Sequence, residues 1–193
     1  MSSITSSKRI LFTESPVSNA LFNDTRWAWI WVIVRLYVGY TWFSSGLGKL
    51  ANPGWIQTGE ILKGYWTRAV TIPAAPAQPL ITYDWYRSFL QSMLDGGSYV
   101  WFSKLIVAGE ILIGLGLILG IFTGIAAFFG AFMNWNFLLA GTVSIIPILL
   151  PLQILLVLAW KTAGWWGLDR WVLNNLGTPW QPGRVFSKQK TDA

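Results

Sequence analysis

Residues 99–160 read YVWFSKLIVAGEILIGLGLILGIFTGIAAFFGAFMNWNFLLAGTVSIIPILLPLQILLVLAW. This apolar run of about 60 residues is long enough for three membrane-spanning helices if the turns between them are tight. Gly120 to Gly124 and Gly141 to Pro147 interrupt it with residues that favour turns. We therefore expect spans over residues 100–120, 123–141 and 146–163.

Another span precedes the run, over residues 27–50. Its sequence, WAWIWVIVRLYVGYTWFSSGLGKL, opens with an aromatic cluster and is followed by Asn52-Pro53-Gly54, a combination that ends helices. With the three later spans it predicts an all-α, integral membrane four-helix bundle over residues 27–163.

Between the first two spans lies a loop over residues 51–99, too long for a simple connector. Prolines divide it into two parts, each able to hold a short amphipathic helix at the membrane interface. The prolines are Pro73, Pro76 and Pro79; one helical face would carry Trp55, Thr58, Leu62 and Tyr65, and the other Trp85, Phe89 and Met93.

Composition excludes several kinds of chemistry. The chain of 193 residues is 53% hydrophobic and 11% charged, with no cysteine and no histidine. Disulfides, thiolate or imidazole metal ligands and Ser-His-Asp catalysis are therefore absent, and we expect no metal and no covalently bound cofactor. The net charge of +6 lies mainly near the two ends of the chain, not in a basic stripe, so we expect no nucleic-acid binding.

The distribution of charge predicts orientation. An even number of spans places both tails on one side, and cytoplasmic segments carry an excess of Lys and Arg. Residues 1–26 form a polar N-terminal tail, and residues 164–193 an amphipathic interfacial segment with a basic C-terminal tail. The tails carry Lys8, Arg9, Arg26, Lys161, Arg170, Arg184, Lys188 and Lys190, against Lys63, Arg68 and Arg87 in the loop. We expect a multi-pass protein of the cell (inner) membrane, with both termini cytoplasmic.

One stripe of the first span, Arg35, Gly39, Trp42, Gly46 and Lys49, recurs at heptad spacing and is cationic at both ends. Its small residues would let another helix, or a flat ligand, approach the backbone closely. In an equally weighted alternative, the side chains of Arg35 and Lys49 extend to opposite interfaces of the membrane and have no other role.

Glu110 lies near the middle of the second span, where an unpaired carboxylate is costly. By depth Arg35 is the first candidate partner, and Lys104 the second, about 9 Å away along the helix. Such a pair indicates either a quinone, proton or anion site or a structural ion pair that locks helix packing.

The remaining polar and small residues favour structural roles. Gly109, Gly116, Gly120 and Gly124 are typical of close helix packing. Asn134, Asn136 and Gln153 suit interhelical hydrogen bonds, with the two asparagines on different faces. We expect the Asp169-Arg170 pair at the membrane surface.

Three stretches resemble the DoxX/DoxD group of small four-helix membrane proteins: residues 34–55 (VRLYVGYTWFSSGLGKLANPGW), 109–141 (GEILIGLGLILGIFTGIAAFFGAFMNWNFLLAG) and 158–171 (LAWKTAGWWGLDRW). The resemblance implies a four-helix membrane bundle. For the DoxD branch it implies the membrane subunit of a thiosulfate:quinone oxidoreductase, which couples two thiosulfates into tetrathionate while reducing quinone and works with a smaller DoxA-like partner.

Two functions follow as hypotheses. In the first, a quinone-linked oxidoreductase subunit, Glu110 and Arg35 are catalytic, and Lys49, Trp42 and Asn134 bind the substrate or the quinone. In the second, the chain is a non-catalytic accessory subunit of a larger respiratory or photosynthetic complex. A small transporter is a weaker third hypothesis, since inverted repeats are lacking.

Overall fold

The computed structural model describes residues 15–178 and 181–187. The elements follow in the order α1 (Pro16–Asn23), η1 (Thr25–Trp27), α2 (Ala28–Leu50), α3 (Pro53–Ile56), α4 (Glu60–Val70), α5 (Asp84–Asp95), α6 (Tyr99–Leu119), α7 (Thr123–Leu139), α8 (Ile146–Leu158), α9 (Trp160–Ala163), α10 (Asp169–Leu176), β1 (Gly177–Thr178), β2 (Gln181–Pro182) and α11 (Arg184–Ser187). In this part of the chain, β structure is limited to the short antiparallel pair β1 and β2. The fold is therefore all-α, as expected.

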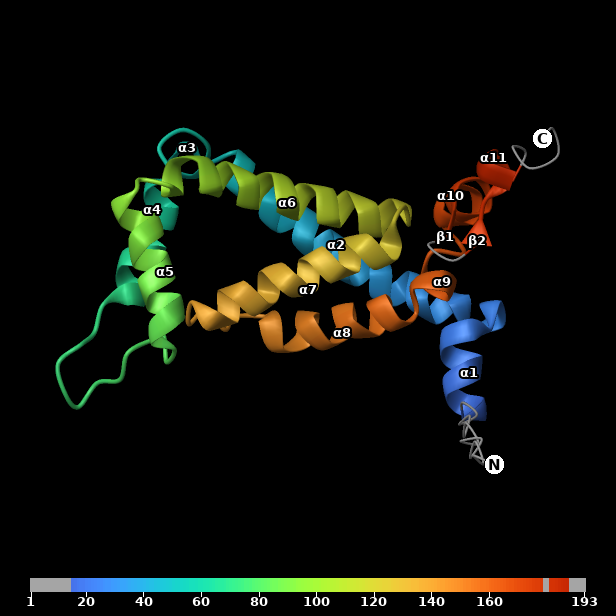
Figure 1. Cartoon of the computed structure of the whole chain (residues 1–193), viewed down its shortest axis with the longest axis horizontal. Coiled ribbons are helices and arrows are strands. Elements are labelled where there is room, and N and C mark those ends of the chain that lie inside the picture. Colours follow the sequence, from blue (N-terminus) through green and yellow to red (C-terminus); the bar gives the residue numbers. More distant parts are fainter. Residues whose placement is uncertain (1–14, 179–180, 188–193) are drawn as a thin grey trace, which may run out of the picture.

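Helices α2, α6, α7 and α8 run alongside one another and form the body of the molecule (Figure 1). With α9 continuing α8, they begin and end within two residues of the four ranges expected from the sequence. The helices α1, α10 and α11 lie at one end of this bundle, and α3, α4 and α5 lie at the other (Figure 1). We call these the terminal end and the loop end.

The turns between the long helices use backbone conformations that suit glycine. Gly120 ends α6 in the left-handed region, with φ of 64°, and its N–H donates to the carbonyl of Gly116. Gly141, which follows α7, also adopts the left-handed region, with φ of 78°. Pro147 then lies in the first turn of α8, where its missing N–H costs nothing. The two breaks seen in the sequence are thus real turns.

Helices α2 and α6 touch so closely that glycine is required. A Cβ on Gly114 would lie 2.6 Å from the backbone nitrogen of Phe43, and a Cβ on Gly46 would lie 2.7 Å from a side-chain atom of Ile111. Gly39 meets Ile118 in the same way at 3.0 Å. From Gly39 to Gly46 the chain advances seven residues along α2, while their contacts go back seven residues along α6, from Ile118 to Ile111. These contacts fix the antiparallel register of the two helices.

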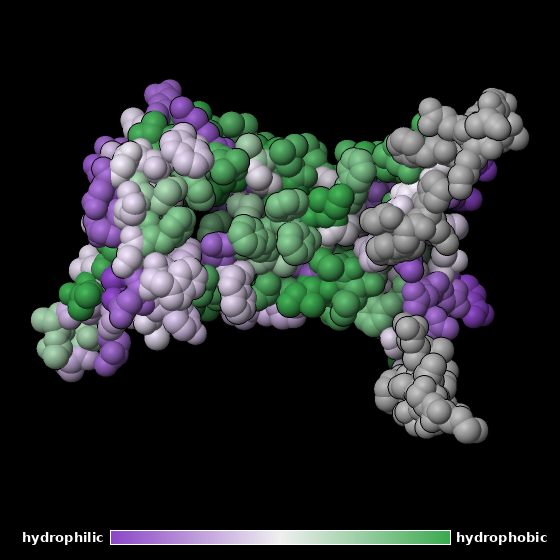
Figure 2. All heavy atoms as spheres, in the orientation of Figure 1, coloured by the Kyte–Doolittle hydropathy of each residue, from purple (hydrophilic) through white to green (hydrophobic). Residues whose placement is uncertain are grey.

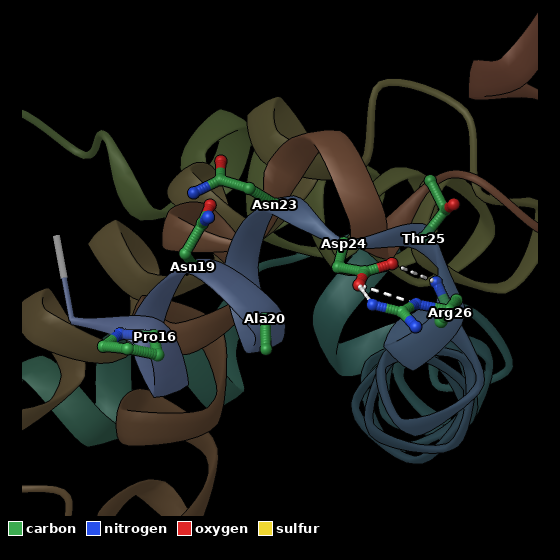
Figure 3. A pocket seen from close by; sticks show the side chains of 7 residues that line it. All are labelled: Pro16, Asn19, Ala20, Asn23, Asp24, Thr25 and Arg26. Carbon is green, nitrogen blue, oxygen red and sulfur yellow. Dashed lines mark hydrogen bonds and ion pairs between the residues drawn. The ribbon is translucent and has the colours of Figure 1, made fainter.

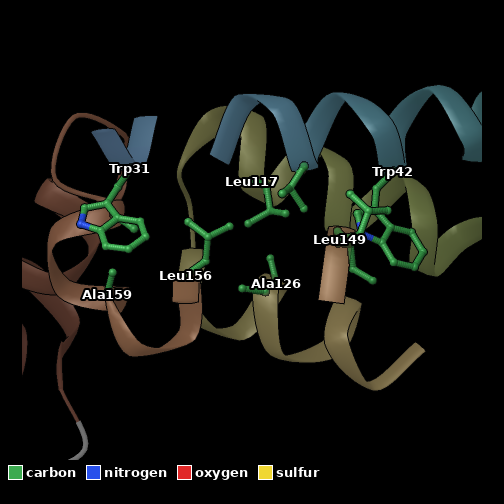
Figure 4. Packing of buried hydrophobic residues seen from close by; sticks show 11 residues of the cluster. Trp31, Trp42, Leu117, Ala126, Leu149, Leu156 and Ala159 are labelled. Atoms are coloured by element: carbon green, nitrogen blue, oxygen red, sulfur yellow. The ribbon is translucent and has the colours of Figure 1, made fainter. Parts of the chain in front are cut away.

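The bundle has two apolar clusters. The first lies toward the terminal end, where side chains of all four long helices point toward one another (Figure 4); its largest members are Trp31, Trp42, Leu117, Leu149 and Leu156. The second fills the loop end and joins the start of α6 to the loop; it consists of Trp55, Leu62, Trp66, Ala69, Ile81, Tyr86, Leu90, Ile106 and Val107.

The loop over residues 51–99 holds the short helices α3, α4 and α5. Of the first expected face, Trp55 on α3 and Leu62 on α4 are buried, whereas Tyr65 on α4 and Thr58, which precedes α4, are exposed. Helix α4 packs on α5 and α6 through Trp66 and Ala69. Helix α5 buries Tyr86 and Leu90 and leaves the expected apolar face, with Trp85 and Phe89, exposed. The loop is thus a packed cap on the bundle and not merely two separate interfacial helices.

On the face shown in Figure 2, hydrophobic side chains cover the middle of the molecule, and hydrophilic ones gather at the loop end and near the terminal end. Among the described residues, α6 alone is both long and apolar enough to cross a membrane, judged by length and composition. Helices α7 and α8 are apolar but shorter, with 17 and 13 residues. Helix α2 has 23 residues but carries many Trp, Tyr, Ser and Gly residues, which are less apolar than Leu or Ile.

Candidate functional site

A cavity of about 1070 Å³ lies among α2, α6 and α7 and extends beneath α4 and α5 at the loop end. Its walls are mostly apolar and aromatic. Four of the five residues expected to form a site line it, namely Trp42, Lys49, Glu110 and Asn134, whereas Arg35 does not. A large apolar cavity with a few converging polar groups is the usual form of a small-molecule site.

The central polar feature of the cavity is an ion pair between Lys49 and Glu110. Lys49 Nζ donates to both carboxylate oxygens of Glu110 at 2.7 Å and to Ser45 Oγ at 2.7 Å. The side chain of Glu110 is 2% exposed and that of Lys49 is 22% exposed. Lys49 Nζ also lies 5.3 Å from the centre of the Trp55 ring, a favourable position for a cation. Glu110 is thus buried and paired, with one side of its partner still accessible.

Arg35 is not the partner of Glu110, so that expectation is wrong, and Lys104 is exposed on the surface of α6. The register of α2 against α6 explains the difference. Gly46 faces Glu110 and Ile111, so the residue one turn further along α2, Lys49, reaches the carboxylate. Arg35 lies about four turns before Lys49, toward the terminal end.

Arg35 is buried at the terminal end, where Nη1 lies 3.4 Å from the carbonyl oxygen of Ile118. Its Nε has no hydrogen-bond partner among the described residues, and the nearby carboxylate of Asp169 interacts with the guanidinium electrostatically. The Arg35 guanidinium thus reaches the turn after α6, beside Gly120 and Gly167. We assign Arg35 to a charge cluster separate from the cavity.

Asp169 is also placed differently from the expectation of a surface pair with Arg170. It is 2% exposed, and its carboxylate accepts hydrogen bonds from the backbone N–H groups of Phe122, at 2.6 Å, and Thr123, at 2.9 Å. Asp169 thus caps the first turn of α7 from a distant part of the chain. Arg170 instead lies over the Trp165 ring, 5.3 Å from its centre.

A chain of polar side chains joins three helices behind the cavity wall. The Nε1 of Trp42 can only donate a hydrogen bond, so the side-chain oxygen of Gln153 on α8 faces it and accepts at 2.7 Å. In this orientation the side-chain nitrogen of Gln153 faces the amide of Asn134 on α7 at 2.6 Å, so Gln153 donates and the Asn134 amide has to present its oxygen. The interhelical contact expected for Asn134 is confirmed, and Gln153, which it contacts, holds the Trp42 ring in place.

Asn136 lies on another face of α7 and contacts the cap. The hydroxyl of Tyr86 on α5 donates to the backbone carbonyl of Asn136 at 3.0 Å. Burial raises the pKa of Tyr86 to about 12. This bond fixes α5 over the cavity, which both residues line.

Sequence reasoning missed Ser45 and Tyr86 as parts of this region, and it predicted an interhelical hydrogen bond for Gln153 without identifying its partners. Ser45 lies one helical turn before Lys49, so its spacing could have indicated contact with the same group. Tyr86 and Gln153 reach their partners only through tertiary packing, which local spacing does not report.

A second, shallower pocket lies at the terminal end, around the turn between α1 and α2 (Figure 3). Asp24 accepts hydrogen bonds from the backbone N–H and the guanidinium of Arg26, at 2.9 and 2.8 Å. The Arg26 guanidinium lowers the pKa of the Asp24 carboxyl. These contacts shape an exposed turn and leave the cavity at the loop end as the stronger candidate.

No cluster of three or more acidic residues able to hold a metal ion occurs within residues 15–178 and 181–187. Comparison of the chain with protein-family models, with curated proteins and with solved structures finds no match.

Proposed function

We propose that this protein crosses a membrane four times and binds a quinone in the cavity, as a subunit that couples quinone reduction to the oxidation of thiosulfate or a related sulfur anion. The observation that carries the proposal is the Lys49–Glu110 pair in the wall of a large, otherwise apolar cavity. The DoxX/DoxD resemblance supplies the substrate class.

Support for four spans comes from the outward faces of the helices. Soluble monomers rarely expose a continuous apolar surface of this extent, and here it covers all four long helices. Exposed apolar side chains include Ile33, Leu36 and Leu47 on α2, Leu105, Leu112 and Leu119 on α6, Phe128, Phe129 and Phe132 on α7, and Ile148, Ile154 and Leu158 on α8. The 21 residues of α6 extend about 32 Å, close to the thickness of the hydrocarbon core.

Aromatic and charged residues support the same placement. Trp165, Trp166 and Trp171 are exposed at the terminal end, and Trp85 and Trp101 at the loop end, where amphipathic rings favour the headgroup region. Because α1 and α10 lie at one end of the bundle, both termini belong on one side, which we assign to the cytoplasm from the Lys and Arg residues of the tails. Lys8, Arg9, Lys188 and Lys190 lie outside the described residues.

The cavity walls suit a quinone headgroup. Lys49 would donate a hydrogen bond from Nζ to a ring oxygen, while Trp42 and Trp55 offer aromatic surfaces to the ring. Glu110 would hold or release a proton beside Lys49, within reach of the Ser45 hydroxyl. A bound quinone would supply the electron acceptor, taking up two electrons and two protons to become a quinol.

The electron donor must come from outside the bundle. Joining two thiosulfates into tetrathionate releases two electrons, which equals the requirement of one quinone. Since the chain has no cysteine or histidine redox centre, these electrons pass directly between the substrates or through a DoxA-like partner. Arg68 and Lys49 line the cavity toward the loop end and provide positive charge for an anionic donor there.

The test is thiosulfate-dependent reduction of a quinone analogue by membranes that contain this chain, alone and with its native partners. We expect Glu110→Gln and Lys49→Gln to lower the rate at least about tenfold while the protein still inserts, since each removes one charge of the pair. Arg170→Gln, at the terminal end and outside the cavity, is the matched control and keeps the rate of wild type.

Wild-type membranes that show no thiosulfate-dependent reduction with any partner would contradict the oxidoreductase proposal. The accessory-subunit hypothesis would then take its place, with the Lys49–Glu110 pair as a lock between α2 and α6.

A further inference from the structure

We infer that the ligand of the cavity enters sideways from the lipid, between α6 and α7, and carries a long apolar tail that stays in this opening. This inference rests on the proposed function and concerns the route and the tail, not the redox reaction. The cavity is not confined to the interior of the bundle.

The cavity lining continues from the buried ion pair onto the outer surface of the bundle. Leu112 on α6 and Phe129 and Phe132 on α7 belong to the lining, yet Leu112 is 68% exposed and Phe132 is 57% exposed. Figure 2 shows a hollow in this apolar surface near the loop end. The interior and the lipid-facing side are therefore parts of one continuous space, which we call the α6–α7 groove where it reaches the outer surface.

A flexible side chain lies at the inner end of the groove. Met133 Sδ would be 3.2 Å from a Cβ on Gly109, the residue next to Glu110. Toward the terminal end, α6 and α7 close on each other, since a Cβ on Gly116 would lie 3.1 Å from that of Ala126. Methionine has three rotatable bonds and adapts to irregular space, so rotation of Met133 beside a glycine widens the passage without moving a helix.

The distribution of polar groups determines which kind of ligand fits. The charged side chains Lys49 and Glu110 stand at the inner end, and the groove itself is lined by Leu, Ile and Phe side chains. An amphiphile with a compact, hydrogen-bond-accepting head and a long hydrocarbon tail matches this order. A small water-soluble molecule would make no use of the groove.

A tail too long for the cavity has to leave through the groove, whereas a headgroup without a tail does not. Blocking the groove should therefore separate the two. The blocking variant is Leu112→Trp with Phe132→Trp, two exposed positions on the two helices that line the groove. Ile154→Trp is the matched control, because Ile154 is similarly exposed on α8 but does not line the cavity.

The experiment measures equilibrium binding of two probes, an isoprenoid benzoquinone with a long tail and its tail-less analogue, to purified protein in lipid nanodiscs. We expect the blocking variant to bind the long-tailed quinone at least about tenfold more weakly, and the tail-less quinone within about twofold of wild type. Ile154→Trp should bind both like wild type.

The route would be refuted if the blocking variant bound the long-tailed quinone as tightly as wild type, or lost both quinones to the same degree. In both cases a wild type that binds quinone leaves the proposed function standing. A wild type that binds neither quinone would instead refute the proposed function, and the route with it.

Discussion

Replacing Asp169 with asparagine should destabilise the bundle far more than its position after the last long helix suggests. The Asp169 carboxylate is buried, accepts two backbone hydrogen bonds at the first turn of α7, and interacts with the buried guanidinium of Arg35. Asparagine keeps the shape of the side chain but removes the charge and turns an N–H₂ group toward one of the two backbone donors.

The expected size of the effect follows from these contacts. A hydrogen bond to a charged group contributes about 1.5–3 kcal/mol, and a negative charge at a helix N-terminus contributes up to about 2 kcal/mol. The amide side chain of the variant would retain one acceptor oxygen, so the Asp169→Asn substitution should lower the free energy of unfolding by about 3 kcal/mol. The loss of the charge near Arg35 acts in the same direction.

The assay is unfolding in mixed micelles by increasing SDS, followed by far-ultraviolet circular dichroism. The control is Asp84→Asn, which also removes an acidic residue from the first turn of a helix; the Asp84 side chain is 90% exposed, so we expect a loss below about 1 kcal/mol. Equal losses in the two variants would refute the role assigned to Asp169.

Two further predictions concern packing and the cap. Gly114→Ala should destabilise the protein by about 1–3 kcal/mol in the same assay, because the new Cβ meets the backbone of Phe43. Gly48→Ala, whose Cβ would meet no described atom within 4 Å, should be neutral or stabilising by up to about 1 kcal/mol. The reverse order of stabilities would contradict the close approach of α2 and α6. Absorbance titration of the tyrosines should show one group with a pKa of about 12 that disappears in Tyr86→Phe. Since the folded pKa of Tyr86 lies above its ordinary value of 10.0, its contribution to stability is present below about pH 10 and is lost as the pH rises toward 12; an unchanged titration in Tyr86→Phe would show that another tyrosine is responsible.

The long helices could be located from the sequence because their signals are local. Apolar length, the glycines at 120 and 141, and the Asn52-Pro53-Gly54 sequence act within a few residues of the helix ends they determine. The packing of the cap could not be located in this way. Helix α5 has apolar residues on two faces, and which face is buried depends on α4 and α6, which the local pattern does not contain.

The main error in the predicted site was the partner assigned to Glu110, and this error has a physical cause. Depth along two separate helices does not fix their register, whereas the contacts of Gly39 and Gly46 with α6 do. Depending on how far α2 is shifted along α6, either Arg35 or Lys49 lies opposite the Glu110 carboxylate. The sequence thus identified the residues that carry charge, but the contact between them follows from the close fit of two backbones.

The capping of the first turn of α7 by Asp169 has a consequence for how the protein is made. Leu168 and Asp169 donate backbone hydrogen bonds to the carbonyls of Leu119 and Gly120, so the segment that closes the turn between α6 and α7 is synthesised about 50 residues after it. Until that segment leaves the ribosome, the first amides of α7 lack their acceptor and Arg35 lacks its counter-charge. A chain that stops before Asp169 would therefore carry both defects at once, at the start of α7 and beside α2.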